Sequence, residues 1–215
     1  MKTSTTSLLL WILCLTLAAV PAAAQTVYSN GPINGNTDAW TINFGYIASD
    51  TFNVANNGTT ITGGSFGMWL FPGDIQLTAE LSITSGENGG TSYFDQTLNF
   101  TQSGCVANQY GYNVCTESTT FSGPTLNSGT YWVNLMTASL PSGDPVFWDE
   151  NSGPSQASES AVGSIPSESF TILGSSSSTT STSTSTTTSV PEPSSMMLLG
   201  TGVLGLAGFA RRRLF

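Results

Sequence analysis

Hydrophobic and polar side chains alternate along much of the chain between residues 25 and 174. The clearest run is residues 75–83, where Ile, Leu, Ala, Leu and Ile occupy every second position between polar neighbours. A period of two predicts a β-strand with one face on a core and the other in water. No stretch of this region shows the 3.6-residue period of an amphipathic helix, so we expect an all-β domain.

Weaker alternation recurs along the same region and is separated by clusters of Asn, Gly, Ser and Asp that are typical of turns. The runs are residues 40–46, 66–70, 94–100, 131–135 and 170–172. Roughly eight to eleven short strands with turns at this spacing predict an antiparallel two-layer β-sandwich, jelly-roll-like in its arrangement. The predicted domain covers residues 25–174, a common size for a single core.

Residues 1–24 resemble a targeting segment rather than part of this domain. Lys2 precedes an apolar stretch, residues 8–20, and small residues stand at positions 22 and 24. This order predicts a signal peptide that signal peptidase removes, so that the mature chain begins at Gln25. A membrane anchor is the alternative, but the apolar stretch is shorter than the ~20 residues that a spanning helix needs.

The last part of the sequence has the features of a membrane segment. Residues 194–210 carry no charge and are followed directly by three arginines. At ~1.5 Å per residue this segment would span roughly 25 Å as a helix, close to the hydrocarbon thickness of a bilayer. The arginines predict that the helix ends in the cytoplasm and that the domain lies on the other side of the membrane.

A short Pro-Glu-Pro sequence stands immediately before the apolar segment. The order Pro-Glu-Pro, apolar helix and arginine cluster over residues 190–215 closely resembles the PEP-CTERM sorting signal of Gram-negative bacteria. The resemblance implies that an exosortase, a membrane transpeptidase-like enzyme, recognises the tail and cuts it near Pro-Glu-Pro. An ordinary C-terminal anchor is the alternative. The recognition element would be Pro191, Glu192 and Pro193, and the stop signal Arg211, Arg212 and Arg213.

Residues 175–189 are all Ser or Thr. Such a tract has nothing to bury, so it is predicted to be a disordered linker. If extended, it would reach ~50 Å at ~3.3 Å per residue. Its hydroxyl groups make O-glycosylation an alternative to a bare tether.

The charge of the predicted domain is entirely negative. The chain has 13 acidic and 4 basic residues and no His. The basic residues are Lys2 and residues 211–213, so residues 25–174 keep 12 acids (13 less Glu192) and no cation. This composition excludes nucleic-acid binding through a basic surface, a Ser-His-Asp or Cys-His site, a Schiff-base lysine and a His-ligated metal. No cofactor is indicated.

Two cysteines remain once the predicted signal peptide, with Cys14, is removed. Cys105 and Cys115 flank a segment with Asn108, Gly111 and Asn113, residues that suit a hairpin end. In an oxidising compartment we expect a disulfide between them. A reactive thiol is the alternative, but no cation or His is present to lower its pKa.

Carboxylates are the strongest catalytic groups that this composition offers, and glycoside hydrolysis needs only two of them. The candidates are Asp74, Glu80, Asp149 and Glu150, although scattered acids mostly serve solubility. A calcium site at residues 34–38, whose side chains carry alternating oxygens, is less favoured than a turn. We therefore expect no metal and no enzyme activity.

Aromatic residues near polar ones suggest a sugar-binding surface, because aromatic faces stack on pyranose rings. Trp132 and Trp148 are the leading candidates, and Asp149 and Glu150 follow Trp148 as potential partners of sugar hydroxyls. Core packing is the competing interpretation for both tryptophans, because large aromatic side chains in small sandwiches are usually buried.

These observations favour an exported, non-enzymatic surface protein, sorted through its tail and placed by the resemblance in an exopolysaccharide-producing envelope. A carbohydrate-binding module displayed on that surface is the second hypothesis, and a small glycosidase the third. The expected partners are signal peptidase, an exosortase, the membrane through residues 194–210, and extracellular polysaccharide. We expect a precursor in the inner membrane, followed by a product at the cell surface or in the extracellular matrix.

Overall fold

The computed structural model describes residues 24–75 and 77–176. These residues form fourteen β-strands and no helix, which confirms the all-β prediction. The first sheet contains β1 (Gln25–Ser29), β2 (Ala39–Thr41), β4 (Thr59–Leu70), β7 (Thr101–Ala107), β8 (Asn113–Thr120), β9 (Thr125–Leu126), β11 (Phe147–Asp149) and β14 (Phe170–Ser176). The second contains β3 (Ile47–Val54), β5 (Thr78–Gly86), β6 (Gly89–Asn99), β10 (Gly129–Ser139), β12 (Ala157–Glu159) and β13 (Gly163–Ile165).

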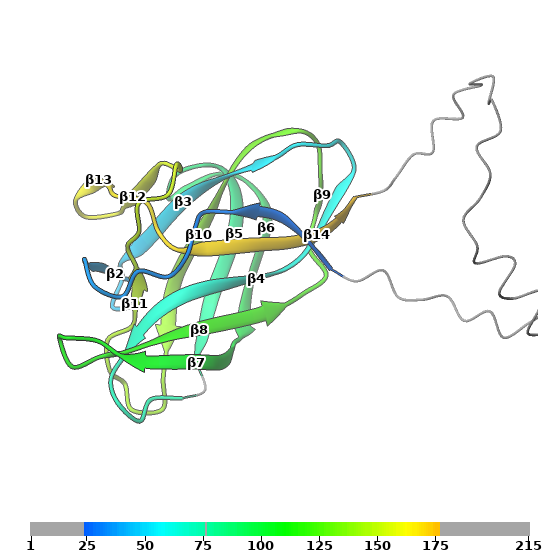
Figure 1. Cartoon of the computed structure of the whole chain (residues 1–215). Helices are drawn as coiled ribbons and strands as arrows, with labels where there is room; N and C mark the ends of the chain where they lie inside the picture. Colours follow the sequence, from blue (N-terminus) through cyan, green and yellow to red (C-terminus); the bar gives the residue numbers. More distant parts are fainter. Residues whose placement is uncertain (1–23, 76, 177–215) are drawn as a thin grey trace, which may run out of the picture. The chain divides into compact units, whose positions relative to one another are not determined.

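Every strand pair in both sheets is antiparallel, and the two sheets lie face to face as layers (Figure 1). The second sheet has the order β13-β12-β3-β10-β5-β6. In the first sheet, β4 is central: β14 and β11 pair along one edge, and β9 and β8 pair along the other. This arrangement confirms the prediction of two antiparallel layers.

The core lies between the sheets and follows the alternation of each strand. On β4, Phe66, Met68 and Leu70 face inward, and Leu81 and Ile83 of β5 face them from the other layer. Each fully buried side chain of this size contributes about 1.5–3 kcal/mol relative to an exposed one. Aromatic rings fill the centre of the core, where Phe66 contacts Phe100, Trp148 and Phe170.

Strand β3 was not predicted, because its pattern is not apolar. Ser49, Asp50 and Thr51 interrupt the strand, yet all three are buried. Ser49 donates a hydrogen bond to the Asn134 side chain on β10 at 2.6 Å. Side-chain hydrogen bonds therefore satisfy polar groups that lie between the core residues Ala48, Phe52 and Val54 of this strand, and a search for hydrophobic alternation does not detect it.

Two predicted strand regions are wrong in part. Residues 40–46 do not form one strand, because the chain turns at Phe44 with φ of 56° and leaves Phe44 and Tyr46 exposed. Ile75 precedes β5 and is 55 % exposed, so it does not belong to the dry face of the predicted run. Both errors lie where a turn shortens a strand.

The predicted disulfide between Cys105 and Cys115 is present. The two residues lie on the adjacent strands β7 and β8, which are joined by the turn that the sequence predicted. Cys105 occupies a bulge and is exposed, whereas the Cys115 side chain is buried in the core. The bond therefore links the edge strand of the first sheet to the strand beside it.

Ser175 and Ser176 pair with Thr60 and Thr59, so β14 continues two residues beyond the predicted domain boundary. Backbone pairing needs no apolar side chain, and composition alone does not reveal it. The described residues include no helix that is long and apolar enough to cross a membrane. Residues 1–23 of the predicted signal peptide, linker residues 177–189 and the predicted helix 194–210 lie outside them.

We predict that residues 25–176, expressed in an oxidising compartment, fold on their own as a monomeric β-rich domain with Cys105 bonded to Cys115. The Cys105→Ser substitution should lower the free energy of unfolding by up to about 3 kcal/mol without unfolding the domain, because the closed ring is small. Denaturant titration followed by circular dichroism measures the change. Two free thiols in the folded product would contradict the prediction.

Candidate functional site

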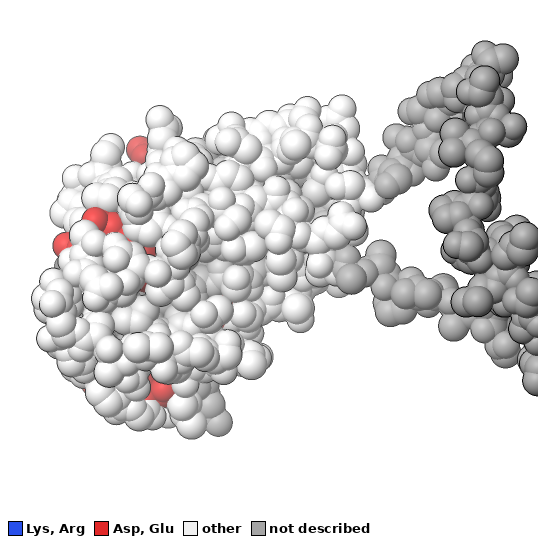
Figure 2. Space-filling model, viewed as in Figure 1, with Lys and Arg blue, Asp and Glu red and all other residues white. Residues whose placement is uncertain are grey.

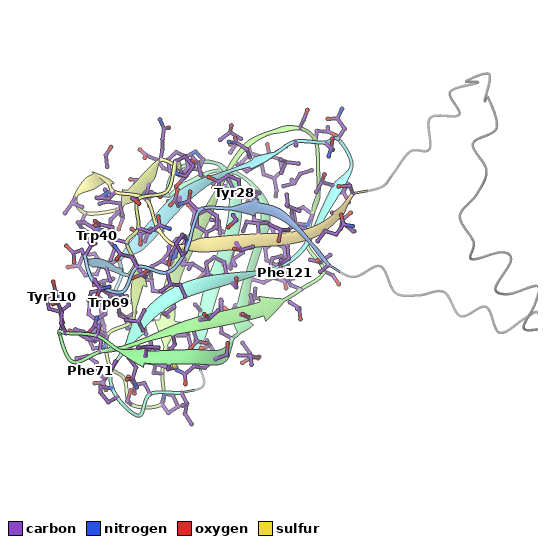
Figure 3. All side chains as sticks on the ribbon, in the orientation of Figure 1. Tyr28, Trp40, Trp69, Phe71, Tyr110 and Phe121 are labelled. Atoms are coloured by element: carbon purple, nitrogen blue, oxygen red, sulfur yellow. A yellow bond between two sulfur atoms is a disulfide. The ribbon has the colours of Figure 1, made fainter. Side chains whose placement is uncertain are left out.

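The described chain begins and ends at the same end of the sandwich, because Gln25 of β1 pairs with Gly174 of β14. Figure 1 shows the loop between β7 and β8 and the loops around β2, β11, β12 and β13 at the opposite end. We call this the distal end. The carboxylates visible in Figure 2 and several labelled aromatic side chains in Figure 3 gather there, which makes it the candidate functional region.

Four buried acids at the distal end form what we call the distal acidic cluster: Asp50, Asp149, Glu150 and Glu168. Asp50 comes from β3 of the second sheet, and Asp149 from β11 of the first. Glu150 and Glu168 pair with each other as an isolated β-bridge. The cluster is electrostatically unusual, because the predicted domain has no Lys, Arg or His to offset it.

The Asp149 carboxylate accepts hydrogen bonds from backbone and indole N–H groups. Its Oδ1 accepts hydrogen bonds from Trp69 Nε1 at 2.6 Å and from Gly35 N at 2.7 Å. Its Oδ2 accepts one from Asn34 N at 2.7 Å. Such bonds stabilise a buried carboxylate and tie the loop before β2 to the first sheet.

Glu168 has no such partners. Its side chain is fully buried, and neither Oε atom has a hydrogen-bond partner among the described residues. Burial, followed by the nearby charges of Asp50, Glu150 and Asp149, holds the pKa of Glu168 well above its usual range. This raised pKa favours the protonated, neutral form of the Glu168 carboxyl more than an exposed glutamate would.

Asp50 is intermediate between Asp149 and Glu168 in how well its carboxylate is hydrogen-bonded. Its Oδ1 accepts a hydrogen bond from Thr51 N at 2.6 Å, and its Oδ2 accepts one from Glu168 N at 2.7 Å. Burial nevertheless raises its pKa to about 6. The Asn30 amide lies beside it and donates to the Ser167 hydroxyl at 2.6 Å, so Asp50 belongs to a polar network between the sheets.

A cavity of about 470 Å³ at the distal end lies beside the acidic cluster but is not lined by it. Its walls include Asn30, Asn34 and Asn151, with Gly and Pro residues between them. Asn30 and Asn34 are hydrogen-bonded to members of the cluster and separate these from the cavity. A molecule in this cavity would therefore contact amide groups and not a pair of carboxylates.

The carboxylates proposed for glycoside hydrolysis do not form one site. Asp74 lies in the turn after β4, and Glu80 faces outward from β5, where it accepts a hydrogen bond from Thr137. Asp149 ends β11 of the first sheet and Glu150 follows it in an isolated bridge with Glu168, at the distal end. Within residues 24–75 and 77–176, no group of three or more His, Cys, Asp or Glu side chains is arranged to hold a metal ion.

The two tryptophans predicted to bind sugar are not brought together. Trp132 is half-buried on the outer face of the second sheet, as the alternation of β10 predicts. Trp148 points from the first sheet into the core, is fully buried, and donates a hydrogen bond to the Ser169 carbonyl. A side chain with no exposed surface cannot stack on a sugar, so the structure removes Trp148 from the candidates.

A different set of aromatic residues gathers on the outside of the first sheet at the distal end. We call it the distal aromatic cluster: Trp69, Phe71, Tyr110, Tyr112 and Phe147. Trp69 and Phe147 pair across β4 and β11, and the two tyrosines come from the turn between β7 and β8. The sequence signal was weak, because only the spacing of tyrosines around a predicted turn marks them.

Comparison with known families concerns the tail alone. Residues 189–213 match the PEP-CTERM protein-sorting motif, which confirms the resemblance over these residues. The match contains Pro191, Glu192 and Pro193 and the three arginines, and it identifies an exported, surface-directed protein that is a substrate for exosortase processing. No curated protein gives a significant match to the chain.

We predict that the domain becomes more stable as pH falls below neutral. Folding raises the pKa of Asp50 to about 6 and that of Glu117, also buried, to about 7, and it raises that of Glu168 strongly. The folded state therefore binds more protons than the unfolded state between about pH 4 and these raised values, so the free energy of unfolding falls as pH rises through that window. Denaturant midpoints from pH 4 to 9 measure the slope.

The Glu168→Gln variant isolates the contribution of the Glu168 carboxyl from that of Glu117, whose buried carboxyl oxygens also lack hydrogen-bond partners among the described residues. A neutral isostere cannot lose a proton, so it should flatten the slope and raise stability above pH 7 relative to the natural protein. Glu87→Gln, which changes an exposed carboxylate in the turn between β5 and β6, is the matched control. A Glu168→Gln protein that keeps the natural slope would show that this group is not protonated in the fold.

Proposed function

We propose that this chain is a non-enzymatic surface protein that presents its β-sandwich domain to the surroundings of an exopolysaccharide-producing cell. The observation that carries the proposal is the match of residues 189–213 to the PEP-CTERM sorting motif. The domain that would be displayed precedes this motif and forms one compact unit over the described residues up to Ser176.

In this proposal the precursor is exported through residues 1–24 and held in the inner membrane by residues 194–210. The two prolines at 191 and 193 keep the approach to this helix non-helical, because proline lacks an N–H and disfavours helical geometry in the residue before it. An extended, accessible backbone is what a processing enzyme needs. The Ser/Thr tract supplies slack between the folded domain and the cut, with or without glycans.

A non-enzymatic role is supported by the chemistry that the domain can offer. Residues 25–174 contain no Lys, Arg or His, so general base, nucleophile and oxyanion roles would all fall on carboxylates, hydroxyls and backbone groups. Asp149 is occupied by three N–H donors, and Glu168 is fully buried. Neither lines the large distal cavity.

The position of the chain ends suits display. Strand β14 leads toward the tether, and it ends beside the start of β1, away from the distal loops (Figure 1). A tether attached at this end leaves the distal aromatic cluster on the far side of the same domain.

We predict that the tail is cut from the finished protein. Replacing Pro191, Glu192 and Pro193 together by alanine should trap the full-length precursor in the membrane, because the recognition element is lost and the helix entrance loses its breaks. Membrane fractionation and mass spectrometry of the native C-terminus measure this. Alanine at Thr186, Thr187 and Thr188, just outside the matched motif, is the matched control and should be processed normally.

A natural product that still contains residues up to Phe215 would overturn exosortase processing and make the tail a plain anchor. Normal processing of the Pro-Glu-Pro variant would show instead that cleavage does not depend on these three residues. Either result is read directly from the mass of the C-terminal peptide.

We predict that the purified chain releases no reducing ends from a panel of polysaccharides. The Asp149→Asn and Glu150→Gln variants should be indistinguishable from the natural protein in the same assay, because their carboxylates hold the fold of the distal end rather than a substrate. Hydrolysis that either substitution abolishes would contradict this and support the glycosidase hypothesis.

A further inference from the structure

We propose that the distal aromatic cluster binds a neutral polysaccharide and that Tyr110 is the residue on which a sugar ring stacks. The inference goes beyond the proposed function. It rests on surface display only because display would bring the domain into contact with polysaccharide. It replaces the pair Trp132 and Trp148 by a site that has exposed aromatic surface.

Tyr110 has the arrangement of a stacking platform. One face of its ring lies on Trp69, with ring centroids 5.6 Å apart and planes inclined by 20°. The residue is nevertheless 54 % exposed, whereas Trp69 beneath it is 5 % exposed. The indole thus covers the inner face of the tyrosine ring, and the outer face is open to solvent. An open aromatic face is the group that takes up the apolar face of a pyranose.

The platform is held in place before any ligand arrives. Tyr110 Oη donates a hydrogen bond to the Asn36 carbonyl at 3.2 Å. The Asn108 side-chain oxygen accepts bonds from the N–H groups of Tyr110 and Tyr112, both at 3.0 Å. Gly111, with φ of 86°, permits the tight turn between them. An exposed side chain fixed in this way loses little entropy on binding, which favours affinity.

The support beneath the platform is equally fixed. Trp69 Nε1 donates to Asp149 Oδ1 at 2.6 Å, and Asp149 is anchored in turn by the N–H groups of Asn34 and Gly35. Asp149 is therefore a positioning residue for the indole, and through it for Tyr110. The buried Asp149 carboxylate and the buried Trp69 indole thus support the exposed ring of Tyr110.

Polar groups and shallow cavities surround the aromatic surface and suit sugar hydroxyls. A cavity of about 110 Å³ is lined by Asp38, Trp69, Tyr112 and Phe147. A second, of about 290 Å³, is lined partly by Asn34, Asn36 and Asn108, the last two of which bond to the Tyr110 turn. Figure 3 shows Trp69, Tyr110, Phe71 and Trp40 together at this end of the domain.

The charges around the distal aromatic cluster indicate which class of glycan it would bind. Asp38 is exposed in the smaller cavity, and Glu150 accepts a hydrogen bond from Trp40 nearby. The predicted domain has no Lys, Arg or His to pair with a carboxylate or sulfate. A uronate-rich polysaccharide would meet only repulsion here, whereas carboxylates and amides accept hydrogen bonds from neutral sugar hydroxyls. The observations therefore favour a neutral glycan.

The test uses the full-length chain purified in detergent. Its binding is measured by affinity electrophoresis against neutral polysaccharides (dextran, cellulose oligosaccharides, xylan and mannan) and against alginate and polygalacturonate. We expect binding to at least one neutral glycan, with a loss of about tenfold or more in Tyr110→Ala and retention in Tyr110→Phe, which keeps the ring. Trp fluorescence should change on binding, because Trp69 lies directly under the platform.

Tyr93→Ala is the matched control, because Tyr93 is 44 % exposed and packs on Tyr131 of the second sheet. It should bind as the natural protein does, and all variants should unfold at similar temperatures.

The proposal is overturned by no binding to any neutral glycan, by preference for uronates, or by equal loss in Tyr93→Ala. It is also overturned by capture of a protein partner through Tyr110 without glycan binding. None of these outcomes affects tail removal, so failure of this site and failure of the proposed function are told apart.

Discussion

The carboxylate of Asp149 holds the distal end of this domain together. It accepts hydrogen bonds from Asn34, Gly35 and Trp69, and the first two of these stand more than a hundred residues earlier in the chain. Gly67 allows this approach, because a Cβ there would lie 2.1 Å from the Ser169 hydroxyl and 3.0 Å from Asp149 Cβ. Without the carboxylate, the loop before β2 and the indole of Trp69 would lose their common anchor, and the Tyr110 turn would lose its support.

The absence of cations from the predicted domain explains why its buried acids behave so differently. A buried carboxylate must be offset by N–H donors or by a proton when no basic side chain is present. Asp149 has three donors, Asp50 has backbone donors but also a raised pKa, and Glu168 has no partner among the described residues. The same compositional bias therefore accompanies a hydrogen-bonded anchor at Asp149 and a carboxyl with a raised pKa at Glu168.

Hydrophobic alternation was enough to predict two antiparallel layers and strands β4, β5, β6, β10 and β14, because one face of each of these strands packs on a single core. It did not detect β3, where Ser49 and Asp50 are buried by hydrogen bonding. Nor did it place Trp148 in the core, because the inner face of the three-residue strand β11 cannot be identified from its own sequence. The disulfide could be predicted from the local spacing of the two cysteines. The stacking of Tyr110 on Trp69 could not, because it depends on how a turn packs against a strand distant in the sequence.

The pairing of β1 with β14 has a consequence for the whole surface protein. Both ends of the domain lie at one end of the sandwich, so the paired ends of β1 and β14 and the distal aromatic cluster lie at opposite ends of the central strand. Strand β4 has 12 residues, which at ~3.3 Å per residue is roughly 40 Å. A disulfide-linked hairpin carries Tyr110 at the far side of that distance. The position of Tyr110 at the end of the sandwich opposite to the paired ends of β1 and β14 is therefore set by the fold of the domain itself.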